Sequence, residues 1–165
     1  MQSARRLHPR AVDLNLAVLP QRAHDMANPR PSLTLTLLQA REAAMAFFRP
    51  GLNEHDLTEQ QWRVIRILRQ QGELESHQLA NQACILKPSM SGVLKRLERD
   101  GLVTRRKSSE DQRRIFLSLT VQGHQCFLSM SEGMERGYLE IQRQFGEDNM
   151  QQLLALLDEL KKIKP

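Results

Sequence analysis

The segment from Leu86 to Thr120 holds the residues best suited to chemistry, and that chemistry is contact with an anionic polymer. Its first part is predicted to be a helix with one polar face, on which small residues come first and basic residues follow. Small residues let such a face lie close to a sugar-phosphate backbone, and the basic residues then bind its phosphates. The members of this face are Ser89, Ser91, Gly92, Lys95, Arg96 and Arg99.

Local signals define this helix. Pro88 suits a first helical position because it has no N–H to lose there, and Gly101 is placed to end the helix. The other face is an apolar stripe at helical spacing. It consists of Leu86, Met90, Val93, Leu94 and Leu97.

Two short strands are predicted after the helix, at residues 102–107 and 115–119, joined by the polar, turn-forming segment SSEDQRR. A helix followed by a hairpin with a basic tip is the layout of a winged helix-turn-helix. The helix would enter the major groove of DNA and the hairpin would reach the backbone or the minor groove. The alternative is an ordinary amphipathic helix and hairpin with a solvated, charged tip.

The distribution of charge favours the nucleic-acid interpretation. The chain has 165 residues and a net charge of +5. Residues 84–119 hold nine Lys or Arg against four acidic residues, whereas residues 33–83 and 120–165 are both net negative. A basic patch confined to one segment is the electrostatic footprint of a DNA reader.

Several other classes of protein find no support. Cys84 and Cys126 form no CxxC pair and lie near no Cys/His cluster, so we expect neither a metal nor a cofactor. The chain lacks the phosphate-binding, zinc-protease and nucleophile-elbow motifs of common enzymes. No apolar run reaches the roughly 18 residues of a membrane span, so we expect no membrane partner and a cytoplasmic location.

The fold predicted is mainly α with a small β-wing, in four parts. Residues 1–31 form a disordered or dispensable N-terminal extension, within which Met26 is an alternative start. Residues 32–56 are a dimerisation helix that Pro50-Gly51 kinks or interrupts, residues 57–120 the winged helix-turn-helix, and residues 121–165 C-terminal dimerisation helices. The outer helices carry more apolar surface than one small domain can bury, which indicates an obligate homodimer.

Further caps complete the helical prediction. Thr58 and Gln61 are predicted to form a capping box at the start of a helix that buries its Trp residue. Gly72 is predicted to end that helix. Ser76 is predicted to cap the next short helix, and Thr120 a long helix to Phe145. After Gly146 a last helix runs to Ile163.

The stretches LTEQQWRVIRIL, KPSMSGVLKRLERDGLV and DQRRIFLSLT resemble the MarR family of bacterial transcription regulators. The resemblance covers about residues 33–163. It implies a winged-helix dimer on a palindromic operator, with Arg113 entering the minor groove and Asp111 holding the wing in shape. The helix residues that match operator-facing positions are Pro88, Ser89, Ser91, Lys95 and Arg96.

Two of these stretches, with LLQAREAAMAFFRP, are similar to the subgroup that represses operons for degradation of homoprotocatechuate (4-hydroxyphenylacetate). This implies a repressor that a phenolic acid releases from its operator. Arg41 could bind the carboxylate of the effector, because a guanidinium binds carboxylates in bidentate fashion. Alternatively, Arg41 could form a structural ion pair. Met45, Phe48, Trp62 and Arg66 could line the walls of that effector pocket.

Two alternative functions are compatible with the same winged-helix fold. The first is a redox-responsive regulator, in which oxidation of Cys84 would perturb the helix that follows. The second is a module that binds other proteins instead of DNA, against which the concentration of positive charge argues.

Overall fold

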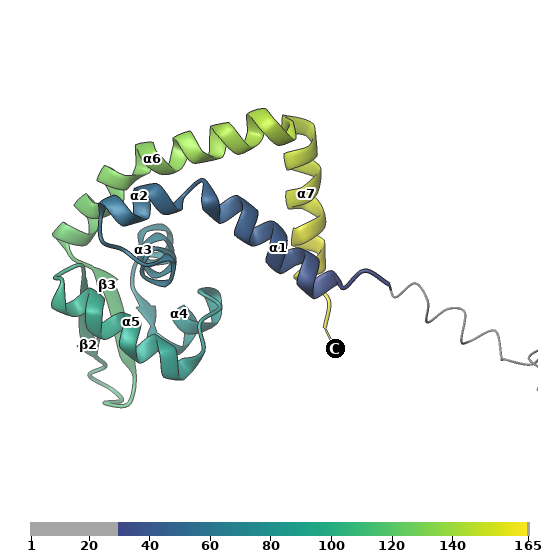
Figure 1. Cartoon of the computed structure of the whole chain (residues 1–165). Coiled ribbons are helices and arrows are strands. Elements are labelled where there is room, and N and C mark those ends of the chain that lie inside the picture. The colour runs from purple at the N-terminus through teal and green to yellow at the C-terminus, as the bar shows by residue number, and fades with distance from the viewer. Residues whose placement is uncertain (1–29, 165) are drawn as a thin grey trace, which may run out of the picture. The chain divides into compact units, whose positions relative to one another are not determined.

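The computed structural model describes residues 30–164 (Figure 1). The chain divides into two units between Leu38 and Gln39. The helices and strands, in chain order, are α1 (Leu33–Ala46), α2 (Arg49–Glu54), α3 (Glu59–Gln71), β1 (Leu74–Glu75), α4 (Ser76–Gln82), α5 (Lys87–Arg99), β2 (Val103–Lys107), β3 (Ile115–Leu119), α6 (Val121–Phe145) and α7 (Glu147–Leu160). Helix α1 crosses the boundary between the units.

The centre of the second unit is a winged helix-turn-helix, as predicted. Helices α3, α4 and α5 pack on one another and on an antiparallel sheet of order β1-β3-β2. In that sheet Leu74 lies opposite Leu117 and Val103 opposite Leu119. The core is aliphatic apart from Trp62, and its most buried side chains include Ile65, Leu68, Leu79, Leu97 and Leu117.

Most of the predicted caps are confirmed. Thr58 and Gln61 form a reciprocal capping box, with N···O distances of 3.2 and 3.0 Å. Gly72 and Gly101 adopt φ of 76° and 68° beyond the ends of their helices, where a side chain would be strained. The Thr120 hydroxyl accepts the Gly123 N–H at 3.0 Å and begins α6.

Several local details differ from the prediction. Helix α4 begins at Ser76, and Glu75 is its cap, because the Glu75 carboxylate reaches the backbone that Ser76 was expected to satisfy. Pro88 is the second helical residue and not the first. Leu86 precedes the helix and is 78% exposed, so it does not join the apolar stripe. Strand β1 was not predicted, since two residues show no periodicity.

The N-terminal dimerisation helix predicted for residues 32–56 is two helices. α1 ends at Ala46, and α2 starts at Arg49 with Pro50 in its first turn. A proline fits the first turn of a helix better than its interior, so the chain starts a new helix there. Helix α7 ends at Leu160, three residues before the predicted end. Residues 1–29, which hold most of the predicted extension, lie outside the described residues.

Helix α6 lies across α2 and α3, and α7 turns away from its end at Gly146 (Figure 1). Gly137 of α6 permits close packing, because a Cβ there would come within 2.9 Å of the Phe48 ring. Helix α7 has no buried residue, and Leu154 and Leu156 are more than half exposed. Among residues 30–164, no helix has the length and apolar character that crossing a membrane requires.

The start of α6 allows a test of the packing between the wing and the long helix. A Cβ on Gly123 would lie 2.1 Å from the backbone oxygen of Leu102, which cannot move freely because it accepts the Thr120 N–H. We expect Gly123→Ala to lower the free energy of unfolding by about 1–3 kcal/mol or more. Thermal or urea denaturation measures this.

Gly133→Ala is the matched control, because its Cβ would meet only the Arg136 side chain at 3.7 Å in the same helix. We expect it to be neutral or to stabilise by up to about 1 kcal/mol, since alanine favours the helix. Equal destabilisation by both substitutions would contradict the close approach at Gly123.

Candidate nucleic-acid interface and ligand pocket

Helix α5 separates its two faces as a reading helix requires. Met90, Val93, Leu94 and Leu97 are buried and fasten it to the core. All six helix residues predicted to contact DNA lie on the exposed side, namely Pro88, Ser89, Ser91, Lys95, Arg96 and Arg99. A Cβ on Gly92 would meet open space, so nothing in the described chain covers this face.

The cations of this face differ in their surroundings. Arg99, at the last turn, donates to Asp100 at 2.8 Å, and this hydrogen bond raises the pKa of Arg99. Lys95 and Arg96 have no acidic partner within 4.0 Å among residues 30–164. They are therefore more available to an external anion than Arg99.

The turn of the wing is built around two oxygen acceptors. Asp111 Oδ1 accepts the Arg113 N–H at 3.0 Å, which suits the shape-holding part expected for Asp111. The buried Ser108 hydroxyl accepts the N–H groups of Glu110 and Asp111 at 3.2 and 3.3 Å. Sequence reasoning missed Ser108, whose only signal was a place in a polar turn.

Arg113 projects from this turn toward the reading helix. Its side chain is exposed and has no acidic partner in the described part of the chain. It lines a cavity of about 330 Å³ together with Lys87 and Ser91 of α5 and His77 of α4. The fold thus places the wing arginine beside the start of the reading helix.

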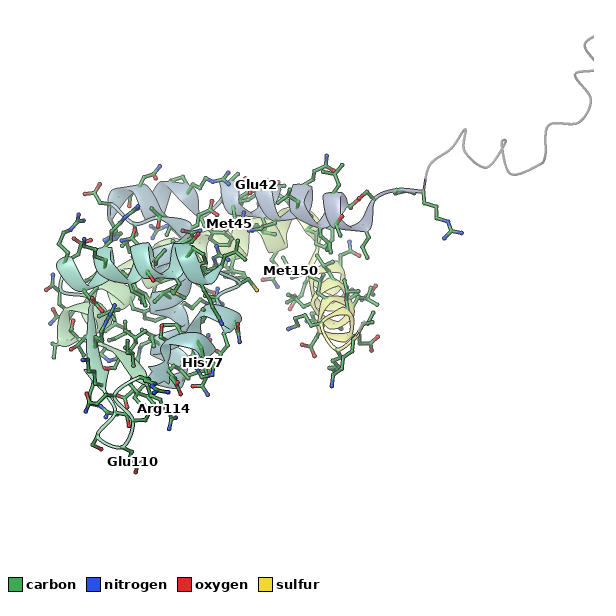
Figure 2. The ribbon with its side chains drawn as sticks, turned by 90° about the horizontal axis from the view of Figure 1, so that it is seen from below. Glu42, Met45, His77, Glu110, Arg114 and Met150 are labelled. Atoms are coloured by element: carbon green, nitrogen blue, oxygen red, sulfur yellow. The ribbon has the colours of Figure 1, made fainter. Side chains whose placement is uncertain are left out.

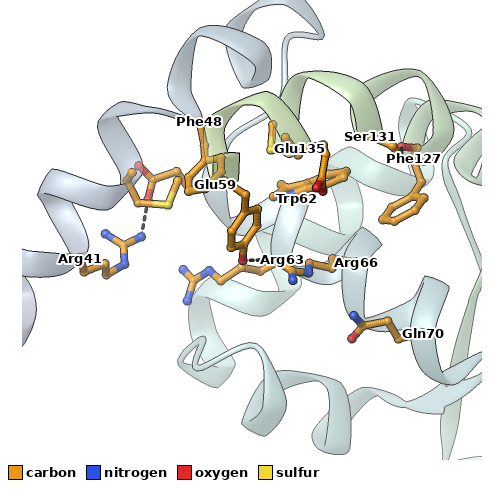
Figure 3. A pocket seen from close by; sticks show the side chains of 13 residues that line it. Arg41, Phe48, Glu59, Trp62, Arg63, Arg66, Gln70, Phe127, Ser131 and Glu135 are labelled. Atoms are coloured by element: carbon orange, nitrogen blue, oxygen red, sulfur yellow. Dashed lines mark hydrogen bonds and ion pairs between the residues drawn. The ribbon is translucent and has the colours of Figure 1, made fainter. Parts of the chain in front are cut away.

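A second cavity, of about 400 Å³, is lined by residues of α1, α3 and α6 and by Phe48, which precedes α2 (Figure 3). The five residues predicted to bind an effector all line it: Arg41, Met45, Phe48, Trp62 and Arg66. Four aromatic side chains form part of its walls. Trp62 stacks on Phe127 with ring centroids 5.4 Å apart, and Phe48 packs against Tyr138 at 5.1 Å.

The two predicted pocket arginines are in different states. Arg41 donates to Glu59 and to Glu42, and Arg49 binds the same two carboxylates, so Arg41 is part of a closed ion cluster. Figure 3 shows its bond to Glu59 at one side of the pocket. Arg66 donates to the Tyr138 hydroxyl at 3.3 Å and has no acidic partner among the described residues. Arg66 is therefore the cation better placed to take a carboxylate.

The ion cluster stays charged. Partial burial raises the pKa of Glu59, but hydrogen bonds from Arg41 and Arg49 outweigh burial and leave that pKa below its usual value. The bond to Glu42 is the main cause of a raised pKa at Arg49. The pocket thus presents an ionised carboxylate, Glu59, as well as the unpaired guanidinium of Arg66.

Sequence reasoning missed the pocket residues of α6, namely Phe127, Ser131, Met134, Glu135 and Tyr138. They occur at the helical spacing of an amphipathic segment that was assigned to dimerisation alone. Only the packing of α6 over α3 brings them to Trp62 and Arg66, so nothing in their spacing could have revealed it.

Comparison with known proteins agrees with this geometry. The MarR family model matches residues 57–115. The homoprotocatechuate degradative operon repressor of Escherichia coli is 51% identical over 128 residues, which is 78% of this chain and 86% of that protein. The chain belongs to the MarR family. It is a MarR-type transcriptional repressor, closely related to that operon repressor, and not an enzyme.

Solved structures support the same assignment. The transcriptional regulator PA4135 matches with a TM-score of 0.81 and 73% identity over 82% of this chain and 100% of that chain. NadR in complex with 4-hydroxyphenylacetate matches with a TM-score of 0.73 and 47% identity over 83% of this chain and 97% of that chain. The winged-helix fold and the family expected from sequence are thereby confirmed.

The two cysteines differ in their surroundings. Burial raises the pKa of the Cys126 thiol, which disfavours the thiolate that oxidants attack. Cys84 is exposed in a left-handed backbone conformation with φ of 50°. Neither cysteine forms a disulfide, and no group of three or more potential metal ligands occurs in residues 30–164.

Arg113 provides the first test of the DNA surface. We expect Arg113→Ala to weaken binding to operator DNA by about 1–3 kcal/mol, because an unpaired wing cation is lost. Fluorescence anisotropy with a duplex from the upstream region of the gene measures this. Arg136→Ala on α6 is the control, since it removes an exposed arginine far along the chain from α5 and the wing. Equal losses in both variants would mean that Arg113 acts only through net charge.

Proposed function

We propose that this repressor binds a palindromic operator as a homodimer and leaves it when a phenolic acid of the 4-hydroxyphenylacetate type fills the aromatic cavity. The observation that carries the proposal is the cavity itself, with an unpaired arginine, an ionised carboxylate and stacked aromatic walls. A relative that is 47% identical has been solved in complex with 4-hydroxyphenylacetate.

The cavity matches the chemistry of such an acid. Its volume of about 400 Å³ lies in the range of small-molecule sites. The Arg66 guanidinium can bind the carboxylate, and the indole of Trp62 offers its face to the ring. The Glu59 carboxylate can accept a phenolic O–H. Each group of the ligand therefore has a counterpart in the lining.

The DNA surface follows from the placement of α5 and the wing. Helix α5 would lie in the major groove, with Pro88, Ser89, Ser91, Lys95 and Arg96 toward the DNA and Arg99 at the far end. Arg113 would enter the minor groove, with Asp111 holding the turn behind it. In a two-fold dimer the reading helices would lie about 34 Å apart, which explains a palindromic operator.

Dimerisation is supported by apolar surface that the described residues 30–164 leave exposed. Leu33, Leu35 and Leu38 of α1 are each more than half exposed, as are Leu154 and Leu156 of α7. MarR proteins are typically homodimers. A second copy of the chain is therefore the partner that we propose for these helices, which are the ends of the chain predicted to dimerise.

Helix α3 offers a route from ligand to DNA. It lines the cavity with Trp62 and Arg66, and on its other side it packs on α5 and β3. A ligand can change the arrangement of the reading helices only through unequal affinity for the DNA-bound and free states. A ligand in a cavity bounded by both α3 and α6 contacts two helices, so its affinity can differ between the two states.

The single tryptophan makes ligand binding observable without DNA. We expect 4-hydroxyphenylacetate or 3,4-dihydroxyphenylacetate to change the fluorescence of Trp62 and, at the same concentrations, to release operator DNA in an anisotropy titration. Arg66→Gln should weaken both responses by about 10-fold or more, since a charge-assisted hydrogen bond contributes ~1.5–3 kcal/mol. It should leave operator binding without ligand unchanged.

Arg136→Gln is the matched control, because it removes the same charge from an exposed residue outside the cavity lining. Fluorescence that neither acid changes would reject the effector class and leave the repressor. Salt-independent association with duplex DNA, or none, would reject the repressor and favour the protein-interaction alternative.

The dimer has its own test. We expect Leu154→Glu to shift the protein toward monomer in analytical ultracentrifugation and to weaken operator binding, because a charge would enter an apolar interface. Gln152→Glu adds the same charge on another side of α7 and should leave the dimer intact. A wild-type protein that sediments as a monomer at micromolar concentration would overturn the proposed assembly.

A further inference from the structure

The arginines of the wing do not all face solvent freely. Arg105 binds Glu98 at 2.6 Å, Arg106 binds Glu73 and Arg114 binds Glu75. Arg113 is the exception, since no acidic group lies within reach of its side chain among residues 30–164. The strong positive charge seen in the sequence is therefore partly neutralised within the fold.

Arg106 is held on two sides. Its Nε and Nη2 donate to the two oxygens of Glu73 at 3.2 and 2.6 Å, which is a bidentate pair. Its guanidinium also lies 4.9 Å from the centre of the Phe116 ring on the neighbouring strand. The hydrogen bonds lower the pKa of Glu73, which keeps the carboxylate ionised.

Arg114, directly before β3, is also held by an acid and by the Phe116 ring. Its Nε and Nη2 donate to Glu75 Oε2 at 3.1 and 3.0 Å, and its guanidinium lies 5.2 Å from the Phe116 ring. The Nδ1 atom of His77 lies 3.1 Å from Glu75 Oε1, and Glu75 also caps α4. Figure 2 shows Arg114 and His77 close together, while Glu110 lies at the tip of the wing loop.

Phe116 is thus enclosed by two guanidiniums, and each guanidinium is tied to an acid of the segment Glu73–Glu75. That segment includes β1, whose Leu74 and Glu75 pair with Leu117 and Phe116 of β3. Backbone pairing and two ion pairs therefore join the wing to the start of α4, and two cation–π contacts hold the same arginines against Phe116 within the wing.

We infer that Glu73 and Glu75 are specificity-determining positioning residues, which fix the wing and withhold Arg106 and Arg114 from DNA phosphates. The inference rests on the proposed DNA binding. With those two arginines held back, Arg113 is the wing arginine left to contact DNA. The acids would lower affinity for DNA of any sequence more than affinity for the operator.

The reason lies in the origin of non-specific binding. Each cation that neutralises a phosphate releases a counterion and steepens the dependence of log K on log salt by about 0.9. These contacts carry no sequence information, so every arginine withheld from phosphates removes non-specific affinity. Exposed ion pairs add little to the stability of a fold. For Glu73, whose pair with Arg106 is exposed, we therefore expect the effect in DNA binding and not in folding.

The experiment measures affinity for a random-sequence duplex and for the operator duplex across a series of salt concentrations. We expect Glu73→Gln to steepen the slope on random duplex by about 0.9 per protomer, because Arg106 becomes free. The ratio of operator to random affinity should fall. Glu110→Gln is the charge-matched control at the wing tip, where the Glu110 side chain forms no ion pair with another described residue, and it should change the slope little.

A second substitution at Arg106 completes the test. We expect Arg106→Gln alone to leave the slope unchanged, and Glu73→Gln/Arg106→Gln to return it to the wild-type value. The inference is overturned if Arg106→Gln alone flattens the slope as Arg113→Ala does, because Arg106 would then already contact phosphate. It is also overturned if Glu73→Gln matches Glu110→Gln. A wild-type protein that binds neither duplex would instead reject the proposed function.

Discussion

The burial of helix α3 is the constraint on which the rest of the structure depends. Its apolar stripe, with Val64, Ile65 and Leu68 almost fully buried, holds together α4, α5 and the sheet. Each such side chain contributes about 1.5–3 kcal/mol through burial. Trp62 and Arg66 extend from the same helix into the cavity beneath α6. A displacement of α3 would therefore change the positions of both α5 and the cavity lining.

A second theme is that the fold decides which charges are available. In the pocket, Glu59 and Glu42 occupy Arg41 and Arg49, whereas Arg63 and Arg66 have no acidic partner among residues 30–164. On the wing, acids before and within β1 occupy Arg106 and Arg114, whereas Arg113 has no acidic partner among the same residues. In both places pairing with carboxylates distinguishes a structural arginine from an available one. A count of charges along the chain cannot make that distinction.

Local signals predicted the second unit well because they act through neighbours in the sequence. The capping box at Thr58, the stops at Gly72 and Gly101 and the cap at Thr120 need only a few adjacent residues to form. Errors occurred where two such signals compete or where none exists. Glu75 displaced Ser76 as a cap, Leu86 fell just outside its helix, and the two residues of β1 had no pattern to reveal them.

By itself the sequence determined the order of the helices, the wing and the polar face of α5, because periodicity, caps and turn residues operate over short range. Only the tertiary structure decided how α6 completes the pocket with Phe127 and Tyr138, and which arginines are already paired. The partners in those ion pairs are as many as 39 residues apart, as with Glu75 and Arg114. Such pairs form only when packing brings distant segments together, so their geometry was beyond the reach of sequence spacing.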